Sequence, residues 1–240
     1  MKTETVEYRE GSLAMRGYLA YDETKTGKKP GVLVAHDVFG LGEDPKRRAR
    51  MLAELGYVAL AIDMYGDGKQ PKDIQEGMGL LMGLMNDRAA LRRRVQAASD
   101  ALAKRAEVDS RKLAAIGYCF GGAVVLELAR SGADVAGVVS FHGALNSPNP
   151  ADAKNIKAKV LVCHGAEDPI VPPPEVDAFI KEMRESGCDW EFISYGNTLH
   201  SFTNPAVDGM NNPAAKYNET SDKRSWKAMR DFFDEIFAAA

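Results

Sequence analysis

Short apolar segments recur along the chain and predict its strands. Two strand-like segments at residues 3–9 and 13–21 come first, with Gly11 and Ser12 between them as turn residues. The later apolar runs are short and are followed by turn-forming or polar residues, which is typical of strands buried on both faces. These runs lie at residues 31–35, 57–62, 113–118, 135–141, 160–163 and 190–195.

Amphipathic segments separate these runs and predict helices. Within residues 87–106, Leu91, Val95, Ala98 and Leu102 follow the i, i+4, i+7, i+11 spacing that places side chains on one face of a helix. Further helices are expected between Pro45 and Gly56, over residues 121–131, after prolines 172–174 and around residues 226–236.

The alternation of strands and helices indicates crossover connections, and hence a mostly parallel central sheet with helices on both faces. The two opening strands are expected to pair antiparallel. No repeat, low-complexity segment or linker divides residues 1–240, so we expect a single α/β domain. Residues 63–73 and 202–222 are expected to form loops, the second as a surface excursion near a site.

Composition narrows the classes of partner. The 240 residues are 45% hydrophobic, which is enough for one large core. A net charge of -3 lacks the basic excess that a nucleic-acid or membrane-surface partner usually requires, so neither partner is expected. The basic run at residues 92–94 falls inside a helical pattern and is interpreted as a solvated helix face.

The cysteines and the N-terminal residues indicate a cytoplasmic protein. Residues 1–7 lack the apolar segment of a signal peptide, and no apolar run reaches the roughly 20 residues of a membrane span. The three cysteines show no Cys-x-x-Cys spacing, which argues against a disulfide framework or a thiolate zinc site. A reducing compartment fits this pattern best.

The sequence Gly-Tyr-Cys-Phe-Gly-Gly at residues 117–122 has the form Gly-x-nucleophile-x-Gly between a predicted strand and a predicted helix. That context is typical of a nucleophile elbow, where the nucleophile occupies a sharply turned position and a flanking side chain would clash. The helix start favours negative charge, which suits a thiolate. We therefore predict Cys119 as the nucleophile and the backbone N–H of Phe120 as an oxyanion donor.

A thiol nucleophile needs a general base, and the base needs an orienting group. In α/β-hydrolases these follow in the chain order nucleophile, acid, histidine. Asp168 comes after the run at 160–163 and His200 after the run at 190–195, so both fall in that order. Glu167 is the competing candidate for the acid.

The other histidines leave a second interpretation open. His36, His142 and His164 also lie at the ends of predicted strands, as the ligands of a metal-assisted hydrolase could. No His-x-His or His-x-x-x-His pair is present, and each histidine comes from a different strand. We therefore expect no metal site.

The loop after the strand at 31–35 supplies the second oxyanion donor in this fold, and the N–H of Val38 is the candidate. In the same loop, Asp37 would place a carboxylate beside the thiol and disfavour the thiolate. Bracing the loop is its alternative role. Phe39 and Tyr65 are candidate apolar walls of a substrate pocket.

These segments resemble the dienelactone hydrolase family. The resemblance covers almost the whole chain and includes Asp-Val-Phe-Gly at 37–40, the cysteine elbow, Gly-Ala-Glu-Asp at 165–168 and His-Ser-Phe at 200–202. It implies an α/β-hydrolase fold, a monomeric or loosely associated protein, a Cys-His-Asp triad and no cofactor. It also implies that an acidic residue near the thiol, here Asp37, helps to activate the cysteine when substrate binds.

By the same resemblance, members that cleave dienelactone hold the substrate carboxylate with two arginines. Asn204 stands at the place of one, and residues 78–82, near the place of the other, contain no arginine; Arg88 is the nearest. Because a bidentate arginine clamp is not easily replaced, we expect a different substrate.

The function that these residues predict is the hydrolysis of a small ester or lactone through a thioester on Cys119, with His200 and Asp168 completing the triad. A non-enzymatic ligand-binding or thiol-sensing protein on the same scaffold is the alternative, together with a metal-assisted hydrolase.

Overall fold

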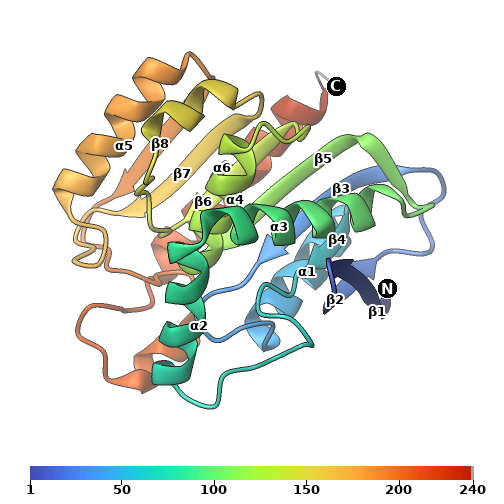
Figure 1. Ribbon diagram of the computed structural model, residues 1–240, viewed down its shortest axis with the longest axis horizontal. Helices are drawn as coiled ribbons and strands as arrows, with labels where there is room; N and C mark the ends of the chain where they lie inside the picture. The colour runs from blue at the N-terminus through green and yellow to red at the C-terminus, as the bar shows by residue number, and fades with distance from the viewer. Residues whose placement is uncertain (239–240) are drawn as a thin grey trace.

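The central sheet positions every other element. In the computed structural model, which describes residues 1–238, eight strands lie in the order β1-β2-β4-β3-β5-β6-β7-β8 (Figure 1). β1 pairs with β2 and β2 with β4 in the antiparallel sense, and the other pairs are parallel, as predicted. The strands are β1 (Lys2–Glu10), β2 (Leu13–Tyr21), β3 (Lys29–Ala35), β4 (Val58–Ala61), β5 (Val108–Tyr118), β6 (Gly137–Phe141), β7 (Lys159–Gly165) and β8 (Trp190–Tyr195).

Helices cover both faces of this sheet. α1 and α6 share one buried cluster with the sheet, and α3, α4 and α5 share the cluster on the other face. The helices are α1 (Glu43–Leu55), α2 (Ile74–Asn86), α3 (Arg88–Ala103), α4 (Phe120–Arg130), α5 (Pro173–Ser186) and α6 (Glu219–Ala238), with 3-10 helices η1 (Pro150–Asn155) and η2 (Pro205–Met210). Among residues 1–238, no helix combines the length and the apolar content that crossing a bilayer requires.

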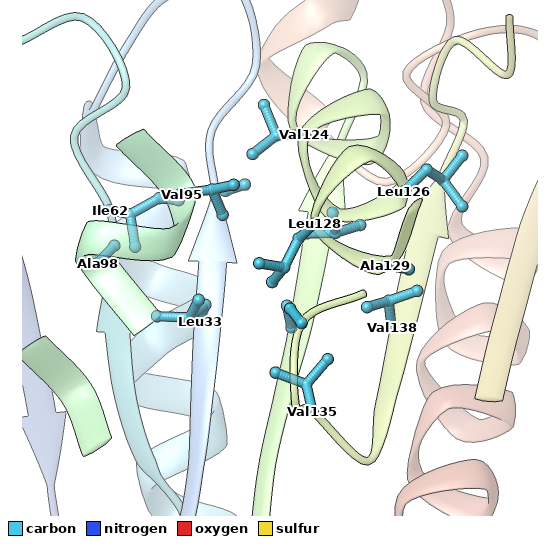
Figure 2. Close-up of a cluster of buried hydrophobic side chains, with 14 of the residues drawn as sticks. Leu33, Ile62, Val95, Ala98, Val124, Leu126, Leu128, Ala129, Val135 and Val138 are labelled. Atoms are coloured by element: carbon cyan, nitrogen blue, oxygen red, sulfur yellow. The ribbon is translucent and has the colours of Figure 1, made fainter. Parts of the chain in front are cut away.

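Strand β3 shows how alternating side chains divide the core. Val32 and Val34 join the cluster with α1 and α6, whereas Leu33 joins the cluster with α3 and α4. Figure 2 shows part of the second cluster, where Val95 and Ala98 of α3 lie close to Leu33. Because each such side chain contributes about 1.5–3 kcal/mol on burial, both faces of the central strands are firmly held.

Helix α2 is absent from the sequence-based prediction. Its sequence contains Gly77, Gly79 and Gly83 among apolar residues on all sides, so it lacks the one-sided pattern of an amphipathic helix. The helix start is nevertheless marked, because the carboxylate of Asp73 accepts a hydrogen bond from the N–H of Glu76 (2.8 Å).

Two other boundaries differ from the prediction. α6 begins at Glu219, inside the segment expected as a loop up to residue 222, and η2 interrupts that loop. β5 begins at Val108 rather than at 113, because Lys29 and Pro30 of β3 pair with its first residues before a shift in register.

Candidate active site

Cys119 occupies a strained turn between β5 and α4. Its φ of 54° and ψ of -113° lie outside the regions that L-residues favour. A Cβ on Gly117 would lie 1.9 Å from the carbonyl oxygen of Gly121, and one on Gly121 would lie 2.2 Å from that of Ala35. The predicted reason for both glycines is confirmed, since this turn has no room for a side chain at either position.

The backbone of Cys119 is fixed by the neighbouring strand and helix. Its N–H donates to the carbonyl of Phe141 on β6 (3.0 Å), and its carbonyl accepts from the N–H of Gly122 (3.0 Å). The side chain is half-buried. Because the first N–H groups of a helix lack partners within it and carry partial positive charge, the start of α4 beside the sulfur favours an anion.

Asp168 and His200 are brought together by the ends of β7 and β8. The Nδ1 of His200 lies 2.7 Å from Oδ2 of Asp168, and both side chains are buried. The other carboxylate oxygen accepts the N–H groups of Ile170 (2.8 Å) and Val171 (3.2 Å), which fixes the direction of the acid. Glu167, the competing acid, is exposed. Asp168 is therefore the carboxylate that contacts the histidine.

The surroundings of His200 favour the imidazolium. Burial lowers the pKa of this ring, but the neighbouring Cys119 and the contact with Asp168 outweigh burial and raise the pKa to about 10. Nε2 is buried and finds no hydrogen-bond partner within residues 1–238. Cys119 is thus one of the groups that raise the pKa of the ring, and the unpartnered Nε2 retains its capacity to exchange a proton.

The segment after His200 folds back and forms hydrogen bonds with the backbone of His200. The N–H of His200 donates to the carbonyl of Ala214 (3.2 Å), and its carbonyl accepts from the N–H of Lys216 (3.1 Å). The loop expected near a site therefore returns to the site itself.

The loop after β3 lies beside the elbow. Tyr65 stacks on Phe120 with ring centroids 5.9 Å apart and donates its hydroxyl to the carbonyl of Val38 (3.0 Å). The carboxylate of Asp37 accepts the N–H of Phe39 (2.8 Å), so Asp37 braces the loop. Within residues 1–238 the N–H of Val38 has no acceptor, which leaves this donor available.

Asp37 is also an electrostatic part of this region. Burial raises the pKa of its carboxyl to about 6; the N–H of Phe39 lowers it, Asp44 raises it and His200 lowers it again. The bracing role and a role in charge control are therefore compatible in one side chain.

The two aromatic residues expected as pocket walls differ in exposure. Phe39 is half-buried. Tyr65 is buried, its hydroxyl is used on Val38, and its ring meets the edge of His36 at 4.8 Å. Tyr65 therefore supports the loop after β3, and Phe39 has the more accessible surface.

The residues considered for a carboxylate clamp are engaged elsewhere. Asn204 caps η2, with its amide oxygen accepting the N–H of Ala206 (3.0 Å). Arg88 lies 4.0 Å from the buried carboxylate of Glu127 and donates to the carbonyl of Asn146 (3.4 Å). Asn204 therefore supports η2, and Arg88 lies against Glu127 and Asn146.

The remaining histidines make different contacts. His36 accepts the N–H of Met64 at Nε2 (3.2 Å), so its Nδ1 carries the proton and donates to the carbonyl of Asp37 (2.6 Å). His142 directly follows β6, bonds to Thr203 and packs against His200, and His164 of β7 lies against the ring of Phe192. In the described part of the chain, no group of three His, Cys, Asp or Glu side chains is arranged to hold a metal ion.

One set of contacts around the histidine loop is not predicted by the sequence. Arg48 of α1 is 1% exposed, donates to the carbonyl of Thr203 (2.6 Å) and pairs with Asp222 (2.8 Å). Its guanidinium lies over the rings of Tyr118 and Trp226, 5.3 Å from each centroid. Arg48 and Thr203 are 155 residues apart, so no local pattern could signal that they meet.

A nucleophile elbow at the end of a central parallel strand, followed in chain order by an acid and a histidine that contact one another, defines the α/β-hydrolase class. The model of the dienelactone hydrolase family matches residues 15–237, and the chain belongs to this family. It is therefore a hydrolase that acts on lactones or esters.

Known proteins of two kinds are similar over nearly the whole chain. A Salmonella typhimurium protein named "Putative carboxymethylenebutenolidase" is 29% identical, with 91% of this chain and 82% of that protein covered. Among solved structures, a dienelactone hydrolase-like promiscuous phosphotriesterase from metagenomic libraries is 45% identical, with a TM-score of 0.95 and 98% of both chains covered. A protein titled m3DLH is 46% identical, with the same TM-score and coverage.

Proposed function

We propose that this chain hydrolyses small esters or lactones with Cys119 as nucleophile, His200 as general base and acid, and Asp168 as the group that orients the histidine. The observation that carries the proposal is the contact of 2.7 Å between His200 Nδ1 and Asp168, in a ring whose pKa also responds to Cys119. A triad needs this chain of three groups, in which the acid fixes the base and the base lies against the nucleophile.

In the first half of the proposed reaction, the thiolate of Cys119 attacks the carbonyl carbon of the substrate. The N–H groups of Phe120 and Val38 stabilise the resulting oxyanion, each by about 3 kcal/mol. When the intermediate collapses, the carbon–oxygen bond to the alcohol breaks and the His200 imidazolium protonates that oxygen. The products of this half are an alcohol and a thioester on Cys119.

In the second half, neutral His200 accepts a proton from water, and the hydroxide attacks the thioester carbonyl. The carbon–sulfur bond then breaks, which releases the carboxylic acid and returns the sulfur to its thiolate form beside the imidazolium. A lactone follows the same steps, except that the alcohol and the acid remain parts of one product.

The proposed substrates are neutral at the group that binds beside the scissile bond. This restriction follows from the capping role of Asn204 and the engagement of Arg88 with Glu127, which leave no arginine fork at either position considered for a carboxylate.

The 45% identical phosphotriesterase adds neutral phosphotriesters as a second candidate class. There the sulfur would bond to phosphorus and displace the leaving alcohol. A nitrophenyl dialkyl phosphate tests this class in the same activity panel as nitrophenyl esters.

Three free cysteines and the small net charge support a reducing, cytoplasmic setting with a small-molecule substrate and without a nucleic-acid partner.

The thioester itself provides the direct test. During turnover of a nitrophenyl ester, rapid acid quenching and mass spectrometry are expected to find the acyl group on the Cys119 peptide, removable by hydroxylamine. The buried Cys163, whose pKa burial raises to about 12, is expected to remain unmodified. Turnover with the acyl group on another residue would contradict the proposal. Modification of Cys119 without turnover would favour the thiol-sensing alternative, and loss of activity with a chelator would favour the metal-assisted one.

Replacing Asp37 by asparagine is expected to speed the alkylation of Cys119 by iodoacetamide about fivefold at pH 7.5, and to change it little at pH 5. The folded-state pKa of about 6 means that the carboxylate is charged at the first pH and largely neutral at the second, when it resembles the amide. Asparagine keeps an oxygen to accept the N–H of Phe39. An equal effect at both pH values would show that the charge of Asp37 does not restrain the thiol.

The same substitution has an expected effect on stability. The folded-state pKa of Asp37 lies above the ordinary value of about 3.9, so the folded protein retains a proton that the unfolded chain has released. This group therefore makes stability fall as pH rises from about 4 to 6. Thermal melting of the asparagine variant over this pH range should lack that contribution.

A further inference from the structure

His142 stands at the carboxyl end of β6, between the strand that leads to Cys119 and the strand that leads to Asp168. Its φ is 41°, in the left-handed region, and its N–H donates to the carbonyl of Cys163 (2.8 Å). The residue is only 2% exposed. A side chain other than glycine in this conformation costs about 1–2 kcal/mol, so the surrounding contacts must hold it there.

The imidazole of His142 packs directly on the histidine loop. Its ring centroid lies 5.2 Å from that of His200 at an interplanar angle of 66°, and 5.2 Å from that of Phe202 at 77°. Both are edge-to-face arrangements, which aromatic rings favour. Its Nε2 forms a hydrogen bond with the hydroxyl of Thr203 (2.8 Å). His142 therefore contacts three of the four residues from 200 to 203.

Thr203 is itself anchored from the other side. Its carbonyl accepts a hydrogen bond from Arg48 (2.6 Å), which is buried and paired with Asp222. The hydroxyl that meets His142 thus belongs to a residue fixed to α1. A continuous set of contacts runs from α1 through Thr203 and His142 to the His200 ring.

The contacts of His142 and Thr203 restrict a motion of the His200 ring that Asp168 alone cannot restrict. The carboxylate fixes one atom of the imidazole, Nδ1, and a ring held at one atom can still tilt about that contact. A second ring packed against it restricts this tilt, and Nε2 must point at Cys119 for proton transfer. We propose that His142 is a positioning residue that, together with the hydroxyl of Thr203, holds the His200 ring in line with the sulfur of Cys119. This inference rests on the proposed function.

The effect of His142 is geometric, because the residue carries no charge near neutral pH. Burial lowers its pKa well below 6.5, and His200, Arg48 and His164 lower it further. The charged groups that interact with His200 are Cys119 and Asp168, whose contacts raise its pKa, and the Asp37 carboxylate. A ring that tilts away from Cys119 and Asp168 would lose the contacts that raise its pKa.

The test compares Thr203→Val with Thr203→Ser and adds His142→Phe. Valine replaces the hydroxyl by a methyl group, serine keeps the hydroxyl, and phenylalanine keeps a ring at 142 without the nitrogen. The readouts are the titration of the His200 ring by NMR, and kcat and KM for a nitrophenyl ester. We expect the valine and phenylalanine variants to titrate about one pH unit lower and to lose about tenfold in kcat with little change in KM. The serine variant should match the parent protein.

Val139→Ala is the matched control, because Val139 is a buried neighbour on β6 that belongs to the core rather than to the histidine loop. It should lower the melting temperature and leave the His200 titration unchanged. The proposal is overturned if the valine and phenylalanine variants behave like this control. The NMR titration needs no turnover, so it remains decisive even if Cys119 proves not to be the nucleophile, an outcome that the mass of the acylated peptide reports separately.

Discussion

Replacing Cys119 by alanine is expected to lower kcat for a small nitrophenyl ester by roughly 10⁴-fold or more, with the fold retained. The substitution removes the atom that forms the thioester, whereas His200 and Asp168 keep their contact. Their residual general-base activity toward water lacks a covalent intermediate and should be slow. Steady-state release of nitrophenol measures the loss, and circular dichroism measures the fold.

Cys188→Ala is the matched control for this experiment. Cys188 is also half-buried and unpaired, but its sulfur contacts Ser186 and Met183, away from the elbow. Its removal should leave kcat unchanged. Full ester hydrolysis by the Cys119 variant would rule out the proposed nucleophile, whatever the behaviour of the control.

Replacing Arg130 by methionine is expected to lower the free energy of unfolding by about 3–5 kcal/mol. Arg130 ends α4 and is 1% exposed. It donates twice to Glu182 of α5 (2.7 and 2.8 Å) and once each to Glu127 (3.0 Å) and the carbonyl of Leu145 (2.9 Å). Methionine fills much of the same space but leaves the buried carboxylate of Glu182 without its partner, whereas Glu127 keeps Arg92 (2.8 Å). An unpaired buried carboxylate is the costly outcome. Urea or guanidinium denaturation measures the change.

A control and a second variant identify the cause of that loss. Lys223→Met breaks an exposed pair with Glu219 on α6 and should change stability little, because exposed ion pairs are weak. Replacing Arg130 and Glu182 together with apolar residues of similar size should recover most of the loss, because Glu127 keeps its contact with Arg92. If the double variant is as unstable as the single one, packing rather than unpaired charge is responsible.

The fold was largely predictable because its strands are buried on both faces. Continuous apolar runs such as residues 31–35 arise when α1 and α6 cover one face and α3, α4 and α5 the other. α2 was not predicted, because its glycines and its apolar residues on all sides do not form an apolar stripe on one face of the helix. The true start of β5 depends on a register shift against Pro30, which is a tertiary property.

The candidate chemistry could be predicted to the extent that it is encoded locally. The glycines on either side of Cys119 indicate a sharp turn with no room for side chains. The order of the residues along the chain places Asp168 and His200 at adjacent strand ends. The sequence predicted Asp168 as the acid but left Glu167 as its competitor; the structure distinguishes them, because Asp168 is buried against His200 and Glu167 is exposed. The supporting contacts of Arg48 and His142 join distant segments and leave no local pattern.

The bond from Arg130 to Glu182 has a consequence for motion within the site. Arg130 ends the helix that begins at the nucleophile, and Glu182 lies in the helix that follows the acid loop, so Cys119 and Asp168 belong to one mechanically continuous body. The loop that carries His200 is held instead at Thr203, by Arg48 of α1 and by His142 after β6. Local opening of these contacts should therefore displace the histidine relative to the other two groups, and rarely separate those two from each other.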